Sequence, residues 1–130
     1  MTSSGVRVEF GRDLRPTTAA RPQSMDFHVL AKPSGAICNL DCTYCFFLEK
    51  ADLYPGGHFR MDRSVLERYL EQLLEIQRGP EITISWQGGE PTLLGVEWFR
   101  YAVEVANRVA PQGTVLHHTI QTNATLITDE

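Results

Sequence analysis

The sequence predicts an α/β fold in which strands and helices alternate. Three short stretches with strand character lie near residues 26–31, 82–86 and 114–120. Two longer stretches with helical periodicity separate them. This alternation implies βαβ units, and therefore a parallel sheet with right-handed connections. It fits the start of either a doubly wound sheet or a barrel, and in both folds ligands bind beyond the carboxyl ends of the strands.

The first predicted strand, residues 26–31, draws its strand character from Phe27, Val29 and Leu30. A cluster of breakers at residues 32–35 ends it, because proline and glycine interrupt regular structure. A loop that contains every cysteine of the chain follows directly. The cysteines are therefore expected at the carboxyl end of this strand.

The first predicted helix is marked by apolar residues at helical spacing, namely Val65, Leu66, Tyr69, Leu70, Leu73 and Leu74. We expect Asp62 or Ser64 to cap its start, Ser64 together with Glu67 as a capping box. Gly79 and Pro80 are expected to stop it. The leucines are interpreted as core residues.

The second strand is expected at residues 82–86 and the third at about residues 114–120. Between them a second helix is marked by Val96, Phe99, Ala102, Val103, Ala106 and Val109. Pro111 and Gly113 are expected to end this helix. Thr128 resembles a helix N-cap followed by two acids, which favours the start of another helix there.

Composition is ordinary for one domain with a modest core: 130 residues, 42% hydrophobic and a formal net charge of −4. The mild acidity offers no basic footprint for nucleic acid, and no apolar run is long enough to span a membrane. Residues 1–25 have few large apolar residues and are expected to form a flexible N-terminal tail. Closely spaced cysteines suited to a metal fit a reducing cytoplasm better than an oxidising compartment.

Cys38, Cys42 and Cys45 follow a C-x3-C-x2-C spacing. Three thiolates this close can hold a four-iron cluster and leave one iron with an open coordination position for a small molecule. Other interpretations remain open: three apolar thiols on one helical face, a disulfide plus an odd thiol, or a zinc site completed by His28 or His58.

Gly88, Gly89 and Glu90 follow the second predicted strand. Taken alone, two glycines most often mark a turn. At the end of a strand they also allow a ligand to approach the backbone, and Glu90 adds a carboxylate that could accept hydrogen bonds from an ammonium group. Since residues 121–123 follow the third strand, three unusual segments are expected at one end of the sheet.

The cysteine spacing, with the aromatic Tyr44 before the third cysteine, resembles the cluster loop of the radical S-adenosylmethionine (radical SAM) enzymes. The resemblance implies that the three cysteines hold a [4Fe–4S] cluster and that the Gly-Gly-Glu segment binds the amino group of the methionine moiety of SAM. It also places Tyr44 near the adenine. The implied reaction is reductive cleavage of SAM to a 5′-deoxyadenosyl radical, which abstracts hydrogen from an unactivated carbon.

Longer segments resemble one branch of these enzymes, the anaerobic sulfatase-maturating enzymes of the SPASM type: Ala31-Lys32-Pro33, residues 46–50, residues 86–93 and Gln121-Thr122-Asn123. That resemblance implies oxidation of a sulfatase cysteine or serine to formylglycine, with a ferredoxin or flavodoxin as electron donor. Gln87 and Asn123 are candidates to face the substrate peptide, although Gln87 could equally cap the strand end. Ala124 departs from the branch, which usually has glycine there, so the turn could differ slightly.

The resemblance covers about residues 27–130. It therefore predicts residues 26–130 to be the first three βα units of a radical SAM partial (β/α) barrel, truncated, and inactive alone. No catalytic residue is expected within this stretch, because the later part of such enzymes carries it. Alternatives are a radical SAM maturase of another peptide or protein, a non-catalytic zinc-binding or redox-sensing module, and a Rossmann domain, which the missing Gly-x-Gly-x-x-Gly loop disfavours.

Overall fold

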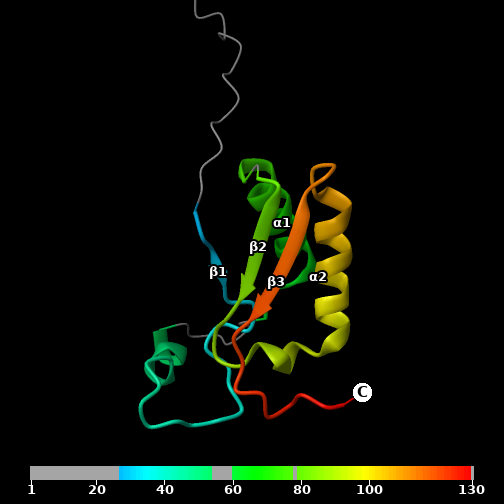
Figure 1. Cartoon of the computed structure of the whole chain (residues 1–130). Coiled ribbons are helices and arrows are strands. Elements are labelled where there is room, and N and C mark those ends of the chain that lie inside the picture. The colour runs from blue at the N-terminus through cyan, green and yellow to red at the C-terminus, as the bar shows by residue number, and fades with distance from the viewer. Residues whose placement is uncertain (1–26, 54–59, 78, 130) are drawn as a thin grey trace, which may run out of the picture.

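The fold is a three-stranded parallel sheet with two α-helices packed against it (Figure 1). The computed structural model describes residues 27–53, 60–77 and 79–129. The strands are β1 (Leu30–Ala31), β2 (Glu81–Trp86) and β3 (Val115–Ile120), in the order β1-β2-β3. The connecting helices are α1 (Arg63–Ile76) and α2 (Val96–Val109), with short 3-10 helices η1 (Leu48–Leu53) and η2 (Pro91–Leu94). The predicted α/β class and the parallel pairing are confirmed.

The core lies between the helices and one face of the sheet. Ile82, Ile84 and Trp86 alternate along β2 and are at most 2% exposed. They pack with buried leucines of α1 and with Ala102, Val105 and Ala106 of α2. Because successive strand residues point to opposite faces, β2 turns only every second residue toward the helices.

The first predicted strand is longer than the observed one. Only Leu30 and Ala31 pair with β2, opposite Ser85 and Trp86. Residues 27–29 are not in a strand, and the Phe27 carbonyl accepts a hydrogen bond from the side chain of Gln77. The Gln77 side chain at the end of α1 therefore bonds to the Phe27 carbonyl, which in a longer strand would have been available to pair with β2.

The start of α1 settles which of two residues caps it. The Asp62 carboxylate accepts from the Val65 backbone N–H at 2.9 Å, and the Ser64 hydroxyl donates to the same carboxylate at 2.7 Å. The predicted capping box of Ser64 with Glu67 is wrong, because Glu67 reaches α2 and accepts from the Tyr101 hydroxyl. The carboxylate is the better cap here because it is charged and complements the helix dipole.

The remaining elements follow the predictions closely, except at the end of the chain. α2 ends at Val109, two residues before Pro111, and β3 covers all but the first residue of the predicted strand. Thr128 and Asp129 are not in a helix, and Glu130 lies outside the described residues. The proposed tail at residues 1–25 also lies outside them, as does His58. None of the helices described is long and apolar enough to cross a membrane.

His118 on β3 is expected to make stability depend on pH. The Trp86 indole N–H donates to His118 Nδ1 at 3.3 Å, so this nitrogen must stay unprotonated, and burial lowers the pKa of His118 below its ordinary 6.5. The unfolded chain then binds a proton more readily than the folded one. We expect the free energy of unfolding to fall as the pH drops from about 7 to about 5, as measured by urea titration. His118→Phe should flatten this fall.

The control for this prediction is His117→Gln. His117 is exposed on the opposite face of β3, where it contacts Glu81 across 3.4 Å, and the control should keep the fall seen in the unmodified chain. An unchanged pH slope in His118→Phe would show that another group is responsible.

Candidate functional site

The candidate site is a cavity at the carboxyl ends of β2 and β3. In Figure 1 both arrowheads point toward the cyan loop that carries the cysteines. The cavity has a volume of about 280 Å³. Three loops line it with Cys38, Leu40, Cys42, Tyr44, Cys45, Phe46, Phe47, Gln87, Gly88, Gly89, Gln121, Thr122 and Asn123. The structure thus brings together every predicted site residue except Glu90.

The three cysteines are free thiols of intermediate exposure. No disulfide joins them, which removes the disulfide interpretation. They do not lie on one face of a helix, since residues 38–46 form an irregular loop with short turns and no helix. The backbone N–H of Cys45 donates to the Cys42 carbonyl at 2.8 Å, which fixes the tight turn between these two ligand candidates.

The arrangement of the thiols also bears on the kind of metal site. Among the described residues, no three His, Cys, Asp or Glu side chains are grouped closely enough for one metal ion. A zinc ion needs four ligands at about 2.0–2.3 Å, whereas each cysteine of an iron–sulfur cube binds a different iron. Three free thiols that line one cavity are compatible with a cluster, in which each would bind a different iron.

His28 cannot complete such a zinc site. It lies beside Gln77, Glu81 and Thr83, at the amino-terminal end of β2. The cysteines lie beyond the other end of the sheet. The zinc site completed by His28 is therefore wrong, and the version with His58 rests on a residue outside the described part of the chain.

Gly88 and Gly89 hold the cysteine loop against the end of β2. The Gly89 backbone N–H donates to the Gly35 carbonyl at 2.9 Å, and that of Glu90 donates to the Ile37 carbonyl at 2.8 Å. A Cβ atom on Gly89 would lie 2.1 Å from the Ile37 carbonyl oxygen. Gly88 has φ +134°, and a Cβ there would lie 2.8 Å from the Gly35 oxygen. The glycines thus allow two backbones to touch directly before Cys38.

The Glu90 carboxylate is buried and its oxygens are bonded within the protein. Oε1 accepts from the Thr92 backbone N–H at 2.9 Å, from the Thr92 hydroxyl at 2.6 Å and from the Thr122 hydroxyl at 2.7 Å. Oε2 accepts from the Asn123 backbone N–H at 2.7 Å. Burial alone would raise the pKa of Glu90, but these hydrogen bonds outweigh it and the pKa is lowered from 4.5. Glu90 is thus a charged link between the loops after β2 and β3.

The burial of Glu90 bears on its expected role. The sequence suggested a carboxylate that accepts from an ammonium group of a ligand, but Glu90 is 0% exposed and is not part of the cavity lining. Its four donors come from residues on both loops. Glu90 can therefore shape the cavity wall without touching what occupies it.

Gln87 and Gln121 form a pair across the two strand ends. Gln87 Nε2 donates to Gln121 Oε1 at 2.9 Å, and both residues line the cavity. The Gln87 backbone N–H also extends the pairing with β1 by donating to the Ala31 carbonyl at 2.8 Å. Gln87 therefore continues the strand with its backbone while its side chain stays on the cavity wall. Both suggested roles for Gln87 remain compatible with this position.

Tyr44 lies at the rim of the cavity, and its side chain is largely free of protein contacts, with 89% of the residue exposed. Phe47, two residues after Cys45, is buried instead, and the Lys32 ammonium lies 4.6 Å from its ring centre. Tyr44 before the last cysteine thus faces outward, whereas Phe47 after it anchors the loop.

Ala124 has φ +62° and is the only described non-glycine residue with a positive φ. The turn after Asn123 thus adopts the left-handed conformation that glycine favours, even though alanine stands here. Its neighbours hold it, because the Ala124 N–H donates to the Thr122 hydroxyl at 3.0 Å.

Sequence reasoning missed Asn39, Thr92 and Thr125. Asn39 and Thr125 bond to each other across two loops, and the Thr92 hydroxyl donates to Glu90 within one loop. Single polar residues in loops carry no periodicity and no spacing that would mark them. The one available signal was position, because Asn39 follows Cys38 and Thr92 follows the Gly-Gly-Glu segment closely.

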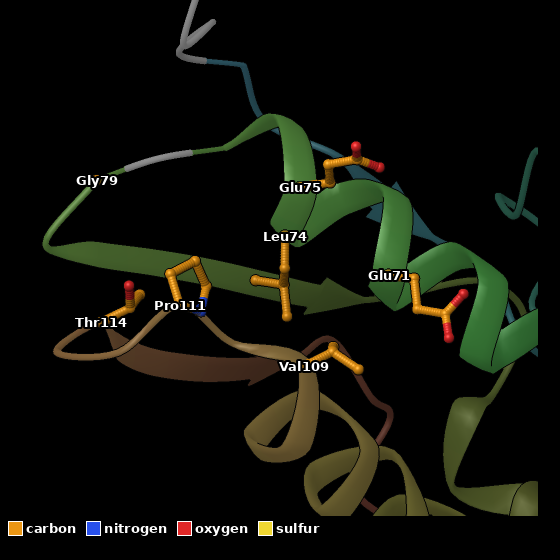
Figure 2. A pocket seen from close by; sticks show the side chains of 7 residues that line it. All are labelled: Glu71, Leu74, Glu75, Gly79, Val109, Pro111 and Thr114. Atoms are coloured by element: carbon orange, nitrogen blue, oxygen red, sulfur yellow. The ribbon is translucent and has the colours of Figure 1, made fainter. Parts of the chain in front are cut away.

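A second cavity, of about 650 Å³, lies at the opposite end of the sheet (Figure 2). It is lined by Glu71, Leu74, Glu75, Gly79, Val109, Pro111 and Thr114, which come from the ends of α1 and α2 and from the residues before β2 and β3. Although it is larger, it contains none of the cysteines. The smaller cavity is the candidate site, because the thiols and the strand-end loops meet there.

Comparison with known proteins gives one family and a consistent group of relatives. Residues 33–130 match the sequence model of the Radical SAM superfamily. A serine-type anaerobic sulfatase-maturating enzyme from Bacteroides thetaiotaomicron is 37% identical over 119 residues, which is 90% of this chain and 28% of that protein. A cysteine-type enzyme from Clostridium perfringens is 35% identical over 100 residues, which is 76% of this chain and 27% of that protein.

The fold matches as well. A solved structure described as native anSMEcpe with bound AdoMet and Kp18Cys peptide superposes with a TM-score of 0.67 at 35% identity, over 77% of this chain and 26% of that one. The chain thus spans about a quarter of the length of these relatives.

Proposed function

Since the chain belongs to the radical SAM superfamily, we propose that it supplies the cluster loop and part of the SAM site of an enzyme that oxidises a sulfatase cysteine or serine to formylglycine. The single observation that carries the proposal is the cavity that joins three free thiols to two glycines at the ends of parallel strands. Relatives named as sulfatase-maturating enzymes support the choice of substrate.

Cys38, Cys42 and Cys45 would hold a [4Fe–4S] cluster, each as a thiolate on a different iron. When bound, such a cluster supplies the electron for the reductive cleavage of SAM, and its fourth iron has no protein ligand. The chain's own contribution is to hold the loop in place. The Gly35 and Ile37 carbonyls fix its start against β2, and buried Phe47 fixes its end.

Gly88 and Gly89 would form the wall against which the methionine moiety of SAM lies. Their backbone is free of side chains on the cavity side, which lets a small ligand approach it. Tyr44 at the rim has an exposed ring that can cover a flat base such as adenine. Glu90 would act as a positioning residue, since its buried carboxylate holds the loop after β3 beside the glycines.

The substrate would be an extended peptide that reaches the cavity past Gln87. The side-chain amide of Gln87, paired with Gln121, presents polar groups that can bind a peptide backbone. The predicted substrate-facing position of Asn123 is compatible with its place in the cavity wall.

We propose a ferredoxin or flavodoxin as electron donor, a cytoplasmic setting, and no partner among nucleic acids or membranes. A net charge of −4 gives neither of these anionic partners a binding surface.

The test of the proposal is anaerobic reconstitution with iron and sulfide of the protein as its gene encodes it. We expect an electron paramagnetic resonance signal of a reduced [4Fe–4S] cluster that changes when SAM is added. Alanine in place of Cys38, Cys42 or Cys45 should abolish cluster binding. The matched control is Thr43→Ala, which changes an exposed residue of the same loop and should keep the cluster.

Two results would contradict the proposal: bound zinc without iron after anaerobic purification, or a cluster whose spectrum ignores SAM. The substrate is tested separately by incubation with SAM, a reductant and sulfatase peptides that carry cysteine or serine at the modified position. Mass spectrometry should detect formylglycine in one or both. Cleavage of SAM without any peptide oxidation would favour a maturase of another peptide.

A further inference from the structure

The sulfur of Cys38 differs from those of the other two cysteines in its hydrogen bonds. It accepts from the Leu40 backbone N–H at 3.4 Å and lies 3.8 Å from the Asn123 side-chain nitrogen Nδ2. As a thiol it also donates to Asn39 Oδ1 at 3.9 Å. These distances are within the range for the larger sulfur atom, which is a weak acceptor. Among the hydrogen bonds of the described residues, neither Cys42 Sγ nor Cys45 Sγ accepts one. The three candidate ligands are therefore not equivalent.

The orientation of the Asn123 amide follows from its partners. Its Oδ1 accepts from the Thr125 backbone N–H at 3.0 Å, and a backbone N–H can only donate. The Thr125 hydroxyl donates to the same oxygen at 2.7 Å. The nitrogen Nδ2 must therefore face the other way, toward Cys38 and Asn39. The Thr125 backbone N–H, which can only donate, thus decides between the two orientations of the Asn123 amide.

A closed ring of three hydrogen bonds holds this arrangement. The Thr125 hydroxyl donates to Asn123 Oδ1, Asn123 Nδ2 donates to Asn39 Oδ1 at 2.9 Å, and Asn39 Nδ2 donates to the Thr125 hydroxyl at 2.8 Å. Within the ring each residue donates once and accepts once, and all three bonds run in the same direction around it, so each bond strengthens the next. The ring uses one Nδ2 hydrogen of Asn123 and leaves the second for the Cys38 sulfur.

The backbone of Asn123 is anchored as well. Its N–H donates to the buried Glu90 carboxylate at 2.7 Å, so the residue is held at both its backbone and its side chain. An N–H group fixed toward a thiolate stabilises negative charge on that sulfur. The reduction potential of an iron–sulfur cluster depends on such hydrogen bonds to its sulfurs. The cluster gains one negative charge on reduction, so the donor favours the reduced form more strongly.

We infer that Asn123, held by its ring with Asn39 and Thr125, is a positioning residue that raises the reduction potential of a cluster bound through Cys38. This inference rests on the proposed function, because it requires a cluster at the three cysteines. It concerns the side-chain amide of Asn123 and leaves the place of this residue in the cavity wall unchanged. Both hydrogens of the Asn123 amide would be used inside the protein.

The test is a redox titration of the reconstituted protein in the absence of SAM and peptide. Electron paramagnetic resonance measures the fraction of reduced cluster at each potential. Asn123→Ala should lower the midpoint potential. At the midpoint of the unmodified protein, we expect the ratio of reduced to oxidised cluster to fall by roughly threefold to tenfold, and tenfold corresponds to about 59 mV for a one-electron couple. Thr125→Val, which keeps the shape but removes the hydroxyl, should shift the potential in the same direction by less.

Two further variants separate this effect from a loss of structure. Thr125→Ser keeps the hydroxyl and should restore the potential of the unmodified protein. Leu126→Ala changes the next side chain, which has no polar atom, and should leave the potential unchanged. If Asn123→Ala takes up no cluster, the pair Thr125→Val and Thr125→Ser decides the question alone.

Equal midpoint potentials in the unmodified protein, Asn123→Ala and Thr125→Val would overturn the inference while leaving the proposed function intact. An equal shift in Leu126→Ala would also overturn it, because the effect would not depend on the ring. If the unmodified protein forms no [4Fe–4S] cluster at all, both the proposed function and this inference fail.

Discussion

Alanine at position 89 should destabilise the protein by roughly 3 kcal/mol or more and prevent the cysteine loop from binding a cluster. The added Cβ would lie 2.1 Å from the Ile37 carbonyl oxygen and 2.5 Å from its carbon. Both atoms belong to a backbone segment that two hydrogen bonds hold in place. The Gly35 carbonyl accepts from the Gly89 N–H, and the Ile37 carbonyl accepts from the Glu90 N–H. The clash can be relieved only by moving the segment that leads into Cys38. Urea titration of Gly89→Ala gives the stability, and iron content after reconstitution gives the loss of binding.

Gly113→Ala is the matched control for this prediction. Gly113 has φ +84° and nothing lies within 4 Å of an added Cβ. Its replacement therefore costs only the strain of a left-handed alanine, about 1–2 kcal/mol, and should leave cluster binding intact. If Gly89→Ala were no less stable than Gly113→Ala and bound iron normally, the close contact with the cysteine loop would not be required.

Replacing Glu90 with glutamine should cost roughly 2–4 kcal/mol, although the two side chains have nearly the same shape. One carboxylate oxygen faces the Asn123 backbone N–H and the other faces the Thr92 backbone N–H. Neither of these donors can reverse, so the amide nitrogen of glutamine would meet an N–H group in either orientation. The measurement is again urea titration. Glu97→Gln, which changes an exposed residue of α2, should cost at most about 0.5 kcal/mol.

The same carboxylate gives a pH dependence with a defined sign. Because the pKa of Glu90 is lowered in the folded state, the unfolded chain takes up a proton at a higher pH than the folded chain does. The stability that Glu90 contributes is therefore complete above the ordinary pKa of 4.5 and is lost as the pH falls through the lower, folded value. Glu90→Gln should lack this part of the acid destabilisation. An identical acid slope in both proteins would contradict the role of the charge.

The elements of the fold could be predicted because their signals are local. Leu66, Leu70, Leu73 and Leu74 fall on one face of a helix, and the alternation of Ile82 with Ile84 marks a strand. The cysteine spacing and the Gly-Gly pair also stand close together in the chain. Such patterns place a residue near the site, but they do not say what its side chain bonds to.

What could not be predicted depends on contacts between distant residues. Glu90 could be recognised as a site residue, but its burial depends on Thr122 and Asn123, 32 and 33 residues away in the chain. The predicted length of the first strand was wrong for the same reason, since Gln77 bonds to Phe27, which is 50 residues away in the chain. Sequence reasoning recovered the positions and missed the partners.

The ring of Asn39, Asn123 and Thr125 has a consequence for the order in which the protein folds. Its members are separated by 84 and 86 residues, so bringing them together closes most of the chain into one loop. Contacts of this range form slowly, because the entropy of loop closure must be lost before any bond repays it. The helices can form early from local contacts, whereas the environment of Cys38 waits for the third strand. We therefore expect cofactor insertion to follow folding of this region, with Cys38 as the last ligand to reach its final surroundings.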